Sequence, residues 1–201
     1  MRISVVVGSH RRNGVTEHLA HVLAGSLAKE TPPIETDILF LADARLEPCQ
    51  ACRKCVKTRA CAIEKDDFKK VLARLKAAEA LVLITPRYAP IPSKVVALIE
   101  RLTSISYNPA EEDQAFSAPL RGKPWGLLGF DSQGMLDPEL ARALADYLEG
   151  FASGYGSLGT TDPPMPPITT ETAVARNASL EEHVLALARM MVKRLTQKEK
   201  R

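Results

Sequence analysis

Four cysteines lie within one short segment of this sequence, and the rest of the chain has none. They are Cys49, Cys52, Cys55 and Cys61, with the spacing C-x2-C-x2-C-x5-C. In a reducing compartment, cysteines gathered in this way are typical of metal or redox chemistry rather than of a disulfide framework. Sulfur ligands of this kind suit an iron–sulfur cluster or a zinc ion.

The spacing favours a cluster over zinc. Structural zinc sites usually combine two C-x-x-C pairs about 12–20 residues apart, whereas three cysteines in successive x2 steps are typical of a [4Fe–4S] loop. The wider gap before Cys61 leaves enough chain for the fourth sulfur to reach the same cluster. We predict all four cysteines as ligands of one cluster, with zinc or free redox-active thiols as the alternatives. Four basic residues lie among them, and we expect their charge to favour the thiolates: Arg53, Lys54, Lys57 and Arg59.

A second polar segment follows the apolar run Ile3–Val7 and precedes an expected helix. Its predicted binding residues are Ser9, Arg11, Asn13, Gly14, Val15 and Thr16. The free N–H groups of a helix N-terminus suit a phosphate, and Arg11 or Arg12 can add a charge-assisted hydrogen bond. The segment matches neither G-x-G-x-x-G nor a Walker loop. We predict a phosphate site here, and the alternative is a polar capping loop.

Two further loops are expected beside the phosphate segment. Their predicted binding residues are Pro86, Arg87, Tyr88 and Ala89 in the first and Asp131 and Gly134 in the second. Prolines stiffen the first loop, and Tyr88 can contact a planar ring face-on or edge-on. The second loop offers a polar partner and close backbone approach. Taken alone, the first loop indicates a strand terminator and the second an ordinary turn.

These loops require a scaffold in which strands and helices alternate. Segments rich in apolar or β-branched residues predict strands over Ile3–Val7, Ile34–Leu41, Ala80–Thr85 and Trp125–Phe130, with a weaker fifth strand, which carries two glycines, over Ser153–Leu158. Apolar residues at helical spacing predict helices over Val15–Ala28, from Asp66 to Leu75, and over Ser93–Ile105, Leu136–Glu149 and Leu180–Leu195. This alternation predicts an α/β fold with an open parallel sheet and helices on both faces.

Length and composition fit a single domain over residues 1–201, with a cysteine loop at 48–62 and an irregular arm, rich in proline and threonine, at 160–178. The net charge of +3 is too small to predict nucleic-acid binding. No apolar run reaches the roughly 18 residues of a membrane span, and the N-terminus lacks a signal-peptide pattern. We therefore expect a cytoplasmic protein with no nucleic-acid or membrane partner.

The segment Gly8–Thr16 reads G-S-x-R-x-x-G-x-T and resembles the start of the NAD(P)H-dependent FMN reductase-like branch of the flavodoxin-like proteins. The resemblance extends through P-C-x-x-C-x-x-C, the Asp66–Asp67 pair and T-P-x-Y, and it covers the first half of the chain better than the second. His10 and Val15 depart from the common pattern, which has proline and a polar residue there, so Val15 can contribute only its backbone N–H. The cysteine motif is similar to that of the iron–sulfur flavoproteins of archaea and anaerobic bacteria.

This resemblance implies a flavodoxin-like, doubly wound five-stranded parallel sheet in the order 2-1-3-4-5. It implies an FMN whose phosphate lies against residues 9–16 and whose ring is lined by the two further loops. The implied protein is an iron–sulfur flavoprotein that transfers electrons with FMN and one [4Fe–4S] cluster. Lys94 and Arg101 match positions that are often basic in the family and have either a structural role or a contact with a neighbouring subunit. No residue is predicted as catalytic.

The implied reaction is a flavin oxidoreduction, with NAD(P)H or a ferredoxin as electron donor and a small molecule as acceptor. The expected assembly is a homodimer or homotetramer. Because the cysteine loop follows the second strand, we expect it at the same sheet edge as the FMN phosphate, with its cluster closer to the FMN of a neighbouring subunit. The alternatives are a cluster-free NAD(P)H-dependent FMN or quinone reductase, a non-enzymatic redox carrier or sensor, and a zinc-stabilised binding module.

Overall fold

The computed structural model describes residues 1–58, 60–87, 91–106, 120, 123–130 and 173–198. Within these residues the strands are β1 (Arg2–Val7), β2 (Glu35–Phe40), β3 (Ala80–Pro86) and β4 (Trp125–Phe130). They form one parallel sheet in the order β2-β1-β3-β4, which confirms the predicted order of the first four strands. The predicted strand at 153–158 and the predicted helix at 136–149 lie outside the described residues.

The central strands are buried on both faces, as expected of a parallel sheet covered by helices. Along β1, Ile3, Val5 and Val7 belong to one hydrophobic core, whereas Val6 belongs to the other. This division follows from the two-residue period of a strand, which points successive side chains to opposite faces. The sheet therefore separates two cores, each closed by its own pair of helices.

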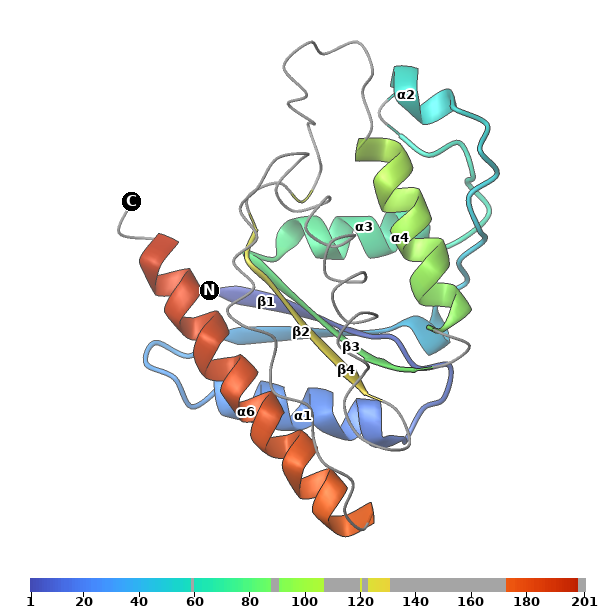
Figure 1. Cartoon of the computed structure of the whole chain (residues 1–201). Helices are drawn as coiled ribbons and strands as arrows, with labels where there is room; N and C mark the ends of the chain where they lie inside the picture. Colours follow the sequence, from blue (N-terminus) through green and yellow to red (C-terminus); the bar gives the residue numbers. More distant parts are fainter. Residues whose placement is uncertain (59, 88–90, 107–119, 121–122, 131–172, 199–201) are drawn as a thin grey trace.

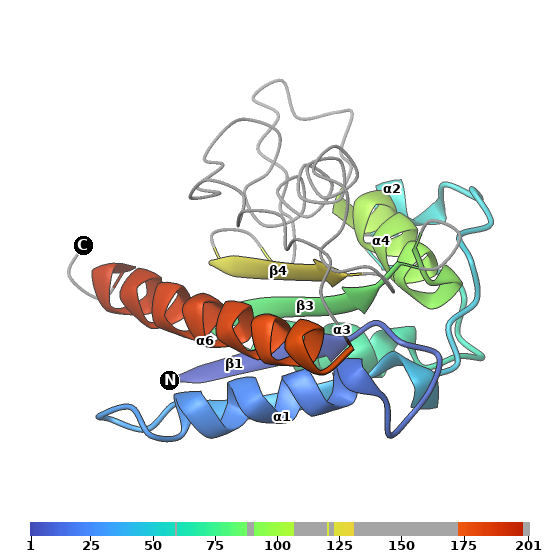
Figure 2. The same ribbon diagram turned by 60° about the horizontal axis from the view of Figure 1, so that its bottom comes forward.

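Helices α1 (Val15–Leu27) and α6 (Ala173–Lys198) run side by side along one face of the sheet (Figures 1 and 2). Helices α3 (Phe68–Ala77) and α4 (Ser93–Ser106) cover the other face (Figure 1). The helices predicted at 15–28, 66–75 and 93–105 are confirmed within a few residues at each end. Among the described residues, no helix combines the length and apolar character needed to cross a bilayer.

The final helix is longer than predicted. Helix α6 begins at Ala173, inside the segment 160–178 that the sequence predicted to be irregular, so the prediction is wrong for its last residues. The last proline before the helix is Pro167, and residues 173–178 contain three alanines. Alanine has the highest helix propensity, so the amphipathic helix anchored from Leu180 onward extends back through this stretch.

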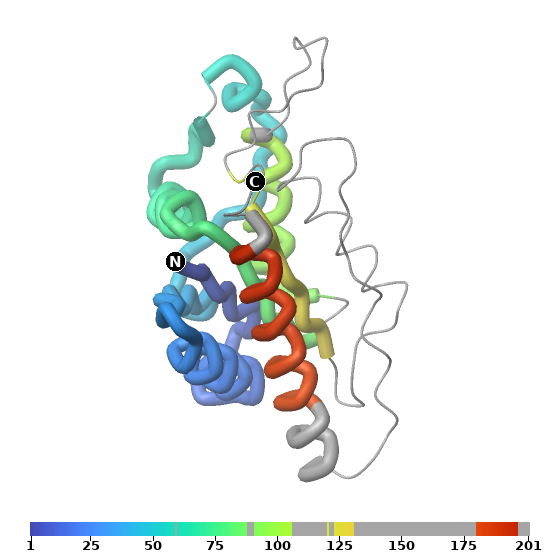
Figure 3. The backbone as a smooth tube through the Cα atoms, turned by 90° about the vertical axis from the view of Figure 1, so that its left-hand side faces the viewer, coloured from blue at the N-terminus to red at the C-terminus, as the bar shows by residue number. Residues whose placement is uncertain are grey.

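Two short helices flank the extended part of the cysteine segment. The 3-10 helix η1 (Leu41–Asp43) follows β2, and α2 (Lys54–Thr58) lies beside α4. Figures 1 and 3 place α2 and α1 at opposite ends of the molecule. Neither short helix was predicted, because each is too short to show a hydrophobic period.

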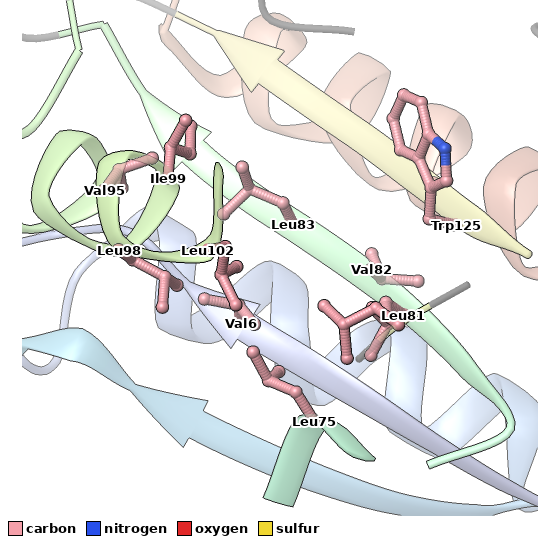
Figure 4. A pocket seen from close by; sticks show the side chains of 12 residues that line it. Val6, Leu75, Leu81, Val82, Leu83, Val95, Leu98, Ile99, Leu102 and Trp125 are labelled. Atoms are coloured by element: carbon pink, nitrogen blue, oxygen red, sulfur yellow. The ribbon is translucent and has the colours of Figure 1, made fainter. Parts of the chain in front are cut away.

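A small apolar cavity of about 50 Å³ lies between the sheet and the α3–α4 layer. Leu75 of α3, Leu98 and Leu102 of α4, and Trp125 of β4 line it (Figure 4). Trp125, at the start of β4, is half-buried at this cavity. Because the lining carries no charged side chain, the cavity offers no partner for a phosphate or a metal, and the candidate site must lie elsewhere.

Candidate functional site

The chain reverses its direction of travel across the sheet between β1 and β3. From β1 it continues outward to β2, and it then returns to form β3 on the other side of β1. In open α/β sheets, ligands bind beyond the carboxyl ends of the strands at such a point. Here the carboxyl ends of the strands are joined by the hydrogen bond from Gly8 N–H to the Ile84 carbonyl, at 2.8 Å, and by that from Arg87 N–H to the Phe130 carbonyl, at 2.6 Å.

Gly8 fixes how closely β1 approaches its neighbours at this edge. A Cβ at this position would lie 2.7 Å from Val95 Cγ2 and 2.8 Å from Thr85 Oγ1, closer than real contacts allow. The absence of a side chain therefore lets β3 and the first turn of α4 close on the start of the phosphate segment. His10 is held to the same helix, because its Nε2 lies 3.4 Å from the hydroxyl of Ser93.

The N-terminus of α1 lacks the side-chain cap that most helices have. Its N-cap residue is Gly14, and no side chain caps the first turn from that position. Glu17, at the third helical position, reaches back to accept a hydrogen bond from Asn13 N–H at 2.6 Å. Because Asn13 precedes the N-cap, this bond holds the chain before the helix, and no side chain at the N-cap serves the first-turn N–H groups. An anion at this end would supply the missing acceptor.

The two arginines of the segment have different environments. Arg12 contacts Glu17 through two nitrogens, at 2.9 and 3.0 Å, pairs with Asp43, and stacks over the ring of Phe40 with its Cζ 3.6 Å from the centroid. The hydrogen bond from Arg12, followed by that from Asn13 N–H, lowers the pKa of Glu17 to about 2. Arg12 is thus committed to carboxylates, and it offsets a negative charge at the helix N-terminus.

Arg11, by contrast, is exposed and has no carboxylate partner within the described part of the chain. Its backbone N–H donates to Ser9 Oγ at 3.0 Å, which closes a tight turn. Asn13 has a φ of 57°, so the backbone turns through the left-handed region just before α1. Of the two arginines that the sequence offered, Arg11 is the one available for a phosphate.

The remaining predicted flavin contacts are only partly described. Pro86 closes β3, where it pairs in register with Phe130, and Arg87 follows it at the same edge. Tyr88 and Ala89 of the first loop, and Asp131 and Gly134 of the second, lie outside the described residues. Their predicted roles stay predictions.

Three of the four cysteine sulfurs contact α4. Cys49 Sγ lies 3.3 Å from Ser104 Oγ, and Cys55 Sγ donates to the Ser104 carbonyl at 3.3 Å. Cys61 Sγ accepts a hydrogen bond from Arg101 Nη2, also at 3.3 Å. Because Arg101 and Ser104 are one helical turn apart, these sulfurs meet a single stretch of the helix.

Helix α4 contacts the chain both before and within the cysteine segment. Lys94, in the first turn of α4, donates through Nζ to the carbonyl of Ala42 at 2.8 Å. The segment then continues along α4, so that the sulfurs meet Arg101 and Ser104, two to three turns further on. Figure 2 shows the cysteine segment beyond the carboxyl ends of the strands, on the same side as the turn between β1 and α1, which agrees with the expected shared edge. That its cluster lies closer to the FMN of a neighbouring subunit stays a prediction.

The fourth cysteine, Cys52, is exposed and lies between two residues with unusual backbone geometry. Ala51 has a φ of 50° and Arg53 a φ of 55°, values that residues with a side chain rarely adopt.

Burial, followed by the neighbouring thiols of Cys61 and Cys49, raises the pKa of Cys55. For that cysteine, burial thus opposes the thiolate that the surrounding basic residues were expected to favour. In the part of the chain that the structure describes, no group of three or more histidine, cysteine, aspartate or glutamate side chains could hold a metal ion.

Arg101, which had no predicted role in the cysteine site, contacts one of its sulfurs and both ends of the cysteine segment. Its side chain has no exposed surface and forms an ion pair with Asp66, whose side chain is equally buried. It also donates to the carbonyls of Glu47 and Ile63, at 3.3 and 3.4 Å. A signal was present in the sequence, because Arg101 lies three residues after Leu98 and therefore falls within the apolar stripe of its helix.

The donor sets fit the two predicted groups to different degrees. At the phosphate segment, an uncapped helix N-terminus, the hydroxyls of Ser9 and Thr16 and an uncommitted guanidinium on Arg11 fit a phosphate. At the cysteines, four sulfurs and the buried Nε of Arg101, which has no hydrogen-bond partner among the described residues, fit an anionic iron–sulfur group in their chemistry. Three of the sulfurs are packed against α4, and the four are not gathered around one point.

Comparison with known proteins supports this description. The chain matches the family model of NADPH-dependent FMN reductase over residues 1–154. An iron–sulfur flavoprotein of Methanocaldococcus jannaschii is 34% identical over 88 residues, which are 44% of this chain and 44% of that protein. An iron–sulfur flavoprotein of Methanosarcina thermophila is 30% identical over 102 residues, which are 50% of this chain and 52% of that protein. These matches span about half the length of each relative.

Solved structures share the fold. RosB, solved with its bound intermediate 8-demethyl-8-formylriboflavin 5′-phosphate, has a TM-score of 0.62 at 18% identity, covering 100% of this chain and 86% of its own. An azoreductase of Bacillus anthracis has a TM-score of 0.61 at 13% identity, covering 93% and 98%. Oxidised flavodoxin 1 of Bacillus cereus has a TM-score of 0.51 at 14% identity, covering 96% and 97%. The fold is therefore flavodoxin-like, and the family match, which covers most of the sequence, shows that this chain belongs to the NADPH-dependent FMN reductase family.

Proposed function

We propose that this chain is a flavin oxidoreductase that binds FMN with its phosphate against residues 9–16. The observation that carries the proposal is the uncapped N-terminus of α1, located where the chain reverses direction between β1 and β3. Such a helix end has unsatisfied N–H groups and the positive end of the helix dipole, both of which favour a dianionic phosphate.

Each residue of the segment has a distinct part in this proposal. The backbone N–H groups of Gly14 and Val15 and the hydroxyls of Ser9 and Thr16 bind phosphate oxygens. Arg11 adds a charge-assisted hydrogen bond. When bound, FMN supplies the electron chemistry, by accepting a hydride or single electrons and passing them on. The chain's contribution is to bind and orient the cofactor.

The ring contacts are proposed from the resemblance and from the position of the loops. Pro86 ends β3 beside the phosphate segment and Arg87 follows it, so the next residues, Tyr88 and Ala89, are proposed to face the ring. Asp131 and Gly134 follow β4, the next strand of the sheet, and are proposed to line the ring from that side. Each of these loops follows the carboxyl end of a strand, which is where open α/β sheets bind their ligands.

We further propose that the four cysteines hold one [4Fe–4S] cluster, which when bound exchanges single electrons. The cysteine spacing and the names of the curated relatives support this proposal. A cluster-free reductase is the second candidate, and one observation favours it: three of the four cysteines contact α4, and the four do not surround a common point. The proposed donor is NAD(P)H or a ferredoxin and the proposed acceptor a small molecule, in a cytoplasmic homodimer or homotetramer.

Binding of FMN and of riboflavin tests the phosphate half of the proposal. Removal of the guanidinium in Arg11→Ala should weaken FMN binding by about 1.5–3 kcal/mol, or roughly 10- to 150-fold, as expected for a hydrogen bond to a charged group. Riboflavin, which lacks the phosphate, should bind both proteins equally. The matched control is Lys29→Ala, which removes the same charge from an exposed position beyond the end of α1. Equal losses for both ligands would contradict a phosphate site at this segment.

An absorption spectrum of protein purified without oxygen, with iron and sulfide assays, tests the cluster half. Flavin bands together with about four irons per chain would support the iron–sulfur flavoprotein. Flavin bands without iron would leave the cluster-free reductase. In Cys49→Ser the iron content should fall while the flavin stays bound, because the two proposed sites share no residue. A protein that binds neither group would overturn both proposals.

A further inference from the structure

A fully buried arginine, Arg101, lies beside the cysteines. Arg101 has no exposed surface, its guanidinium stacks on Phe68 with Cζ 4.0 Å from the ring centroid, and Asp66 balances its charge. A buried ion pair of this kind seldom stabilises a protein more than apolar residues of similar volume would. Its presence therefore calls for a role besides stability, and the contacts of Arg101 indicate one.

Arg101 joins the two ends of the cysteine segment. It donates to the carbonyl of Glu47, two residues before Cys49, and to the carbonyl of Ile63, two residues after Cys61. Asp66, the ion-pair partner of Arg101, also binds the start of the segment, because its Oδ2 accepts the N–H of Glu47 at 3.0 Å. The segment from 47 to 66 is thus tied at both ends to one buried pair.

The donor groups of α4 also reach the sulfurs themselves. Arg101 Nη2 donates to Cys61 Sγ, and Ser104, one turn later, contacts Cys49 through its hydroxyl. Hydrogen bonds to cluster sulfurs are among the factors that set the reduction potential of iron–sulfur proteins. A donor stabilises the more negative, reduced state and so raises the potential. Because Asp66 offsets the charge of Arg101, the effect belongs to the N–H donor rather than to net charge.

We propose that Arg101 and Ser104 are positioning residues of the cysteine site. They hold the segment 47–66 against α4 before any metal is bound and donate hydrogen bonds to the ligand sulfurs afterwards, which raises the reduction potential of the bound group. The first part stands on the contacts alone. The second part rests on the proposed [4Fe–4S] function.

Three variants separate the loss of a hydrogen-bond donor from a change of net charge and from a general loss of stability. The double variant Arg101→Met, Asp66→Asn removes the cation and the anion together, so that net charge is unchanged and no buried charge is left unpaired. Ser104→Ala removes one hydroxyl and serves if the double variant fails to fold. The matched control is Thr103→Ala, because Thr103 is exposed on the same helix and its hydroxyl bonds, among the described residues, only to the Ile99 carbonyl, at 2.9 Å.

Hydrogen exchange by mass spectrometry on the full chain without metal tests the first part. The double variant should show faster exchange across peptides from 47 to 66, whereas β1 peptides and the Thr103→Ala protein should match wild type. Unchanged exchange in 47–66 would overturn the positioning role. This measurement needs no cluster, so it stands even if the proposed function fails.

Redox titration of the loaded protein, followed through the cluster's absorption, tests the second part. The midpoint potential should shift to more negative values in the double variant and in Ser104→Ala, and a chelator should remove iron about tenfold faster or more, as is typical when outer hydrogen bonds are lost. Identical potentials in all proteins would overturn the donor role. A wild-type chain that takes up no iron and sulfide would overturn both the donor role and the cluster proposal, while leaving the exchange result to decide the first part.

Discussion

Arg101 and Asp66 form an ion pair in which neither side chain has any exposed surface. Burial raises the pKa of Asp66, but the hydrogen bonds from Arg101 and from the N–H groups of Glu47 and Phe68 outweigh it and hold that pKa below its ordinary value. Asp66 is therefore a charged carboxylate in the folded protein, and Arg101 supplies the positive charge that compensates it.

Breaking this pair on one side should cost far more than removing it whole. Arg101→Met leaves the Asp66 carboxylate buried without its partner, and we expect it to lower the free energy of unfolding by about 3–5 kcal/mol. The double variant Arg101→Met, Asp66→Asn should lose much less. Urea unfolding followed by circular dichroism measures both. If the double variant were as unstable as the single one, lost packing around Phe68 rather than the unpaired charge would be the cause.

Two glycines offer a matched comparison of packing. Gly8→Ala should lower the free energy of unfolding by about 1–3 kcal/mol, because the new methyl group overlaps Val95 and Thr85. Gly25→Ala, at an open position within α1, should raise it by about 0.5–1 kcal/mol, the usual gain of alanine over glycine in a helix. Thermal unfolding of both variants checks this expectation. A neutral Gly8→Ala would mean that β1 and α4 do not approach as closely as described.

The low pKa of Glu17 predicts a specific acid sensitivity. A carboxylate whose pKa falls from 4.5 in the unfolded chain to about 2 in the folded protein stabilises the fold above about pH 4.5, and this stabilisation disappears as the pH falls toward 2. Unfolding free energies of wild type and Glu17→Gln should therefore converge between pH 4.5 and 2. A constant difference over that range would show that Glu17 does not titrate as described.

Arg12 should influence FMN binding without touching the cofactor. In Arg12→Ala the charge of Glu17 is no longer offset, and it would oppose a phosphate at the same helix end. We expect FMN binding to weaken by about 0.3–1 kcal/mol, roughly two- to five-fold, with riboflavin unaffected. The double variant Arg12→Ala, Glu17→Gln should restore FMN affinity. Failure of this rescue would assign the loss to the Asp43 and Phe40 contacts instead.

The elements that the sequence predicted well are those with a strong local signal. Apart from Ser4, the run Ile3–Val7 is apolar on both faces, which favours a strand covered on both sides. The helix at Ser93–Ser106 was equally clear from its spacing. The start of α6 was missed, because prolines at 163–167 made the whole arm look irregular although the last of them lies before the helix.

The site was harder to predict, because its details depend on contacts between distant segments. The sequence favoured Arg11 as a binding residue but left Arg12 as an alternative donor to the phosphate. Only the fold, which brings Asp43 and Phe40 beside Arg12, distinguishes them. Arg101 likewise gains its role from Asp66, Glu47 and Cys61, partners that sequence spacing cannot bring together.

Helix α4 touches both candidate sites. Its first turn packs on Gly8 and lies beside His10, and Ser104, eleven residues after Ser93, contacts the cysteines. At 1.5 Å per residue, those positions are about 16 Å apart along the axis. The helix thus acts as a spacer of fixed length between the phosphate site and the cysteine site. Neither site can shift along the helix axis independently of the other. Any change that displaces α4 must alter both sites together, whereas a change that leaves α4 in place stays local.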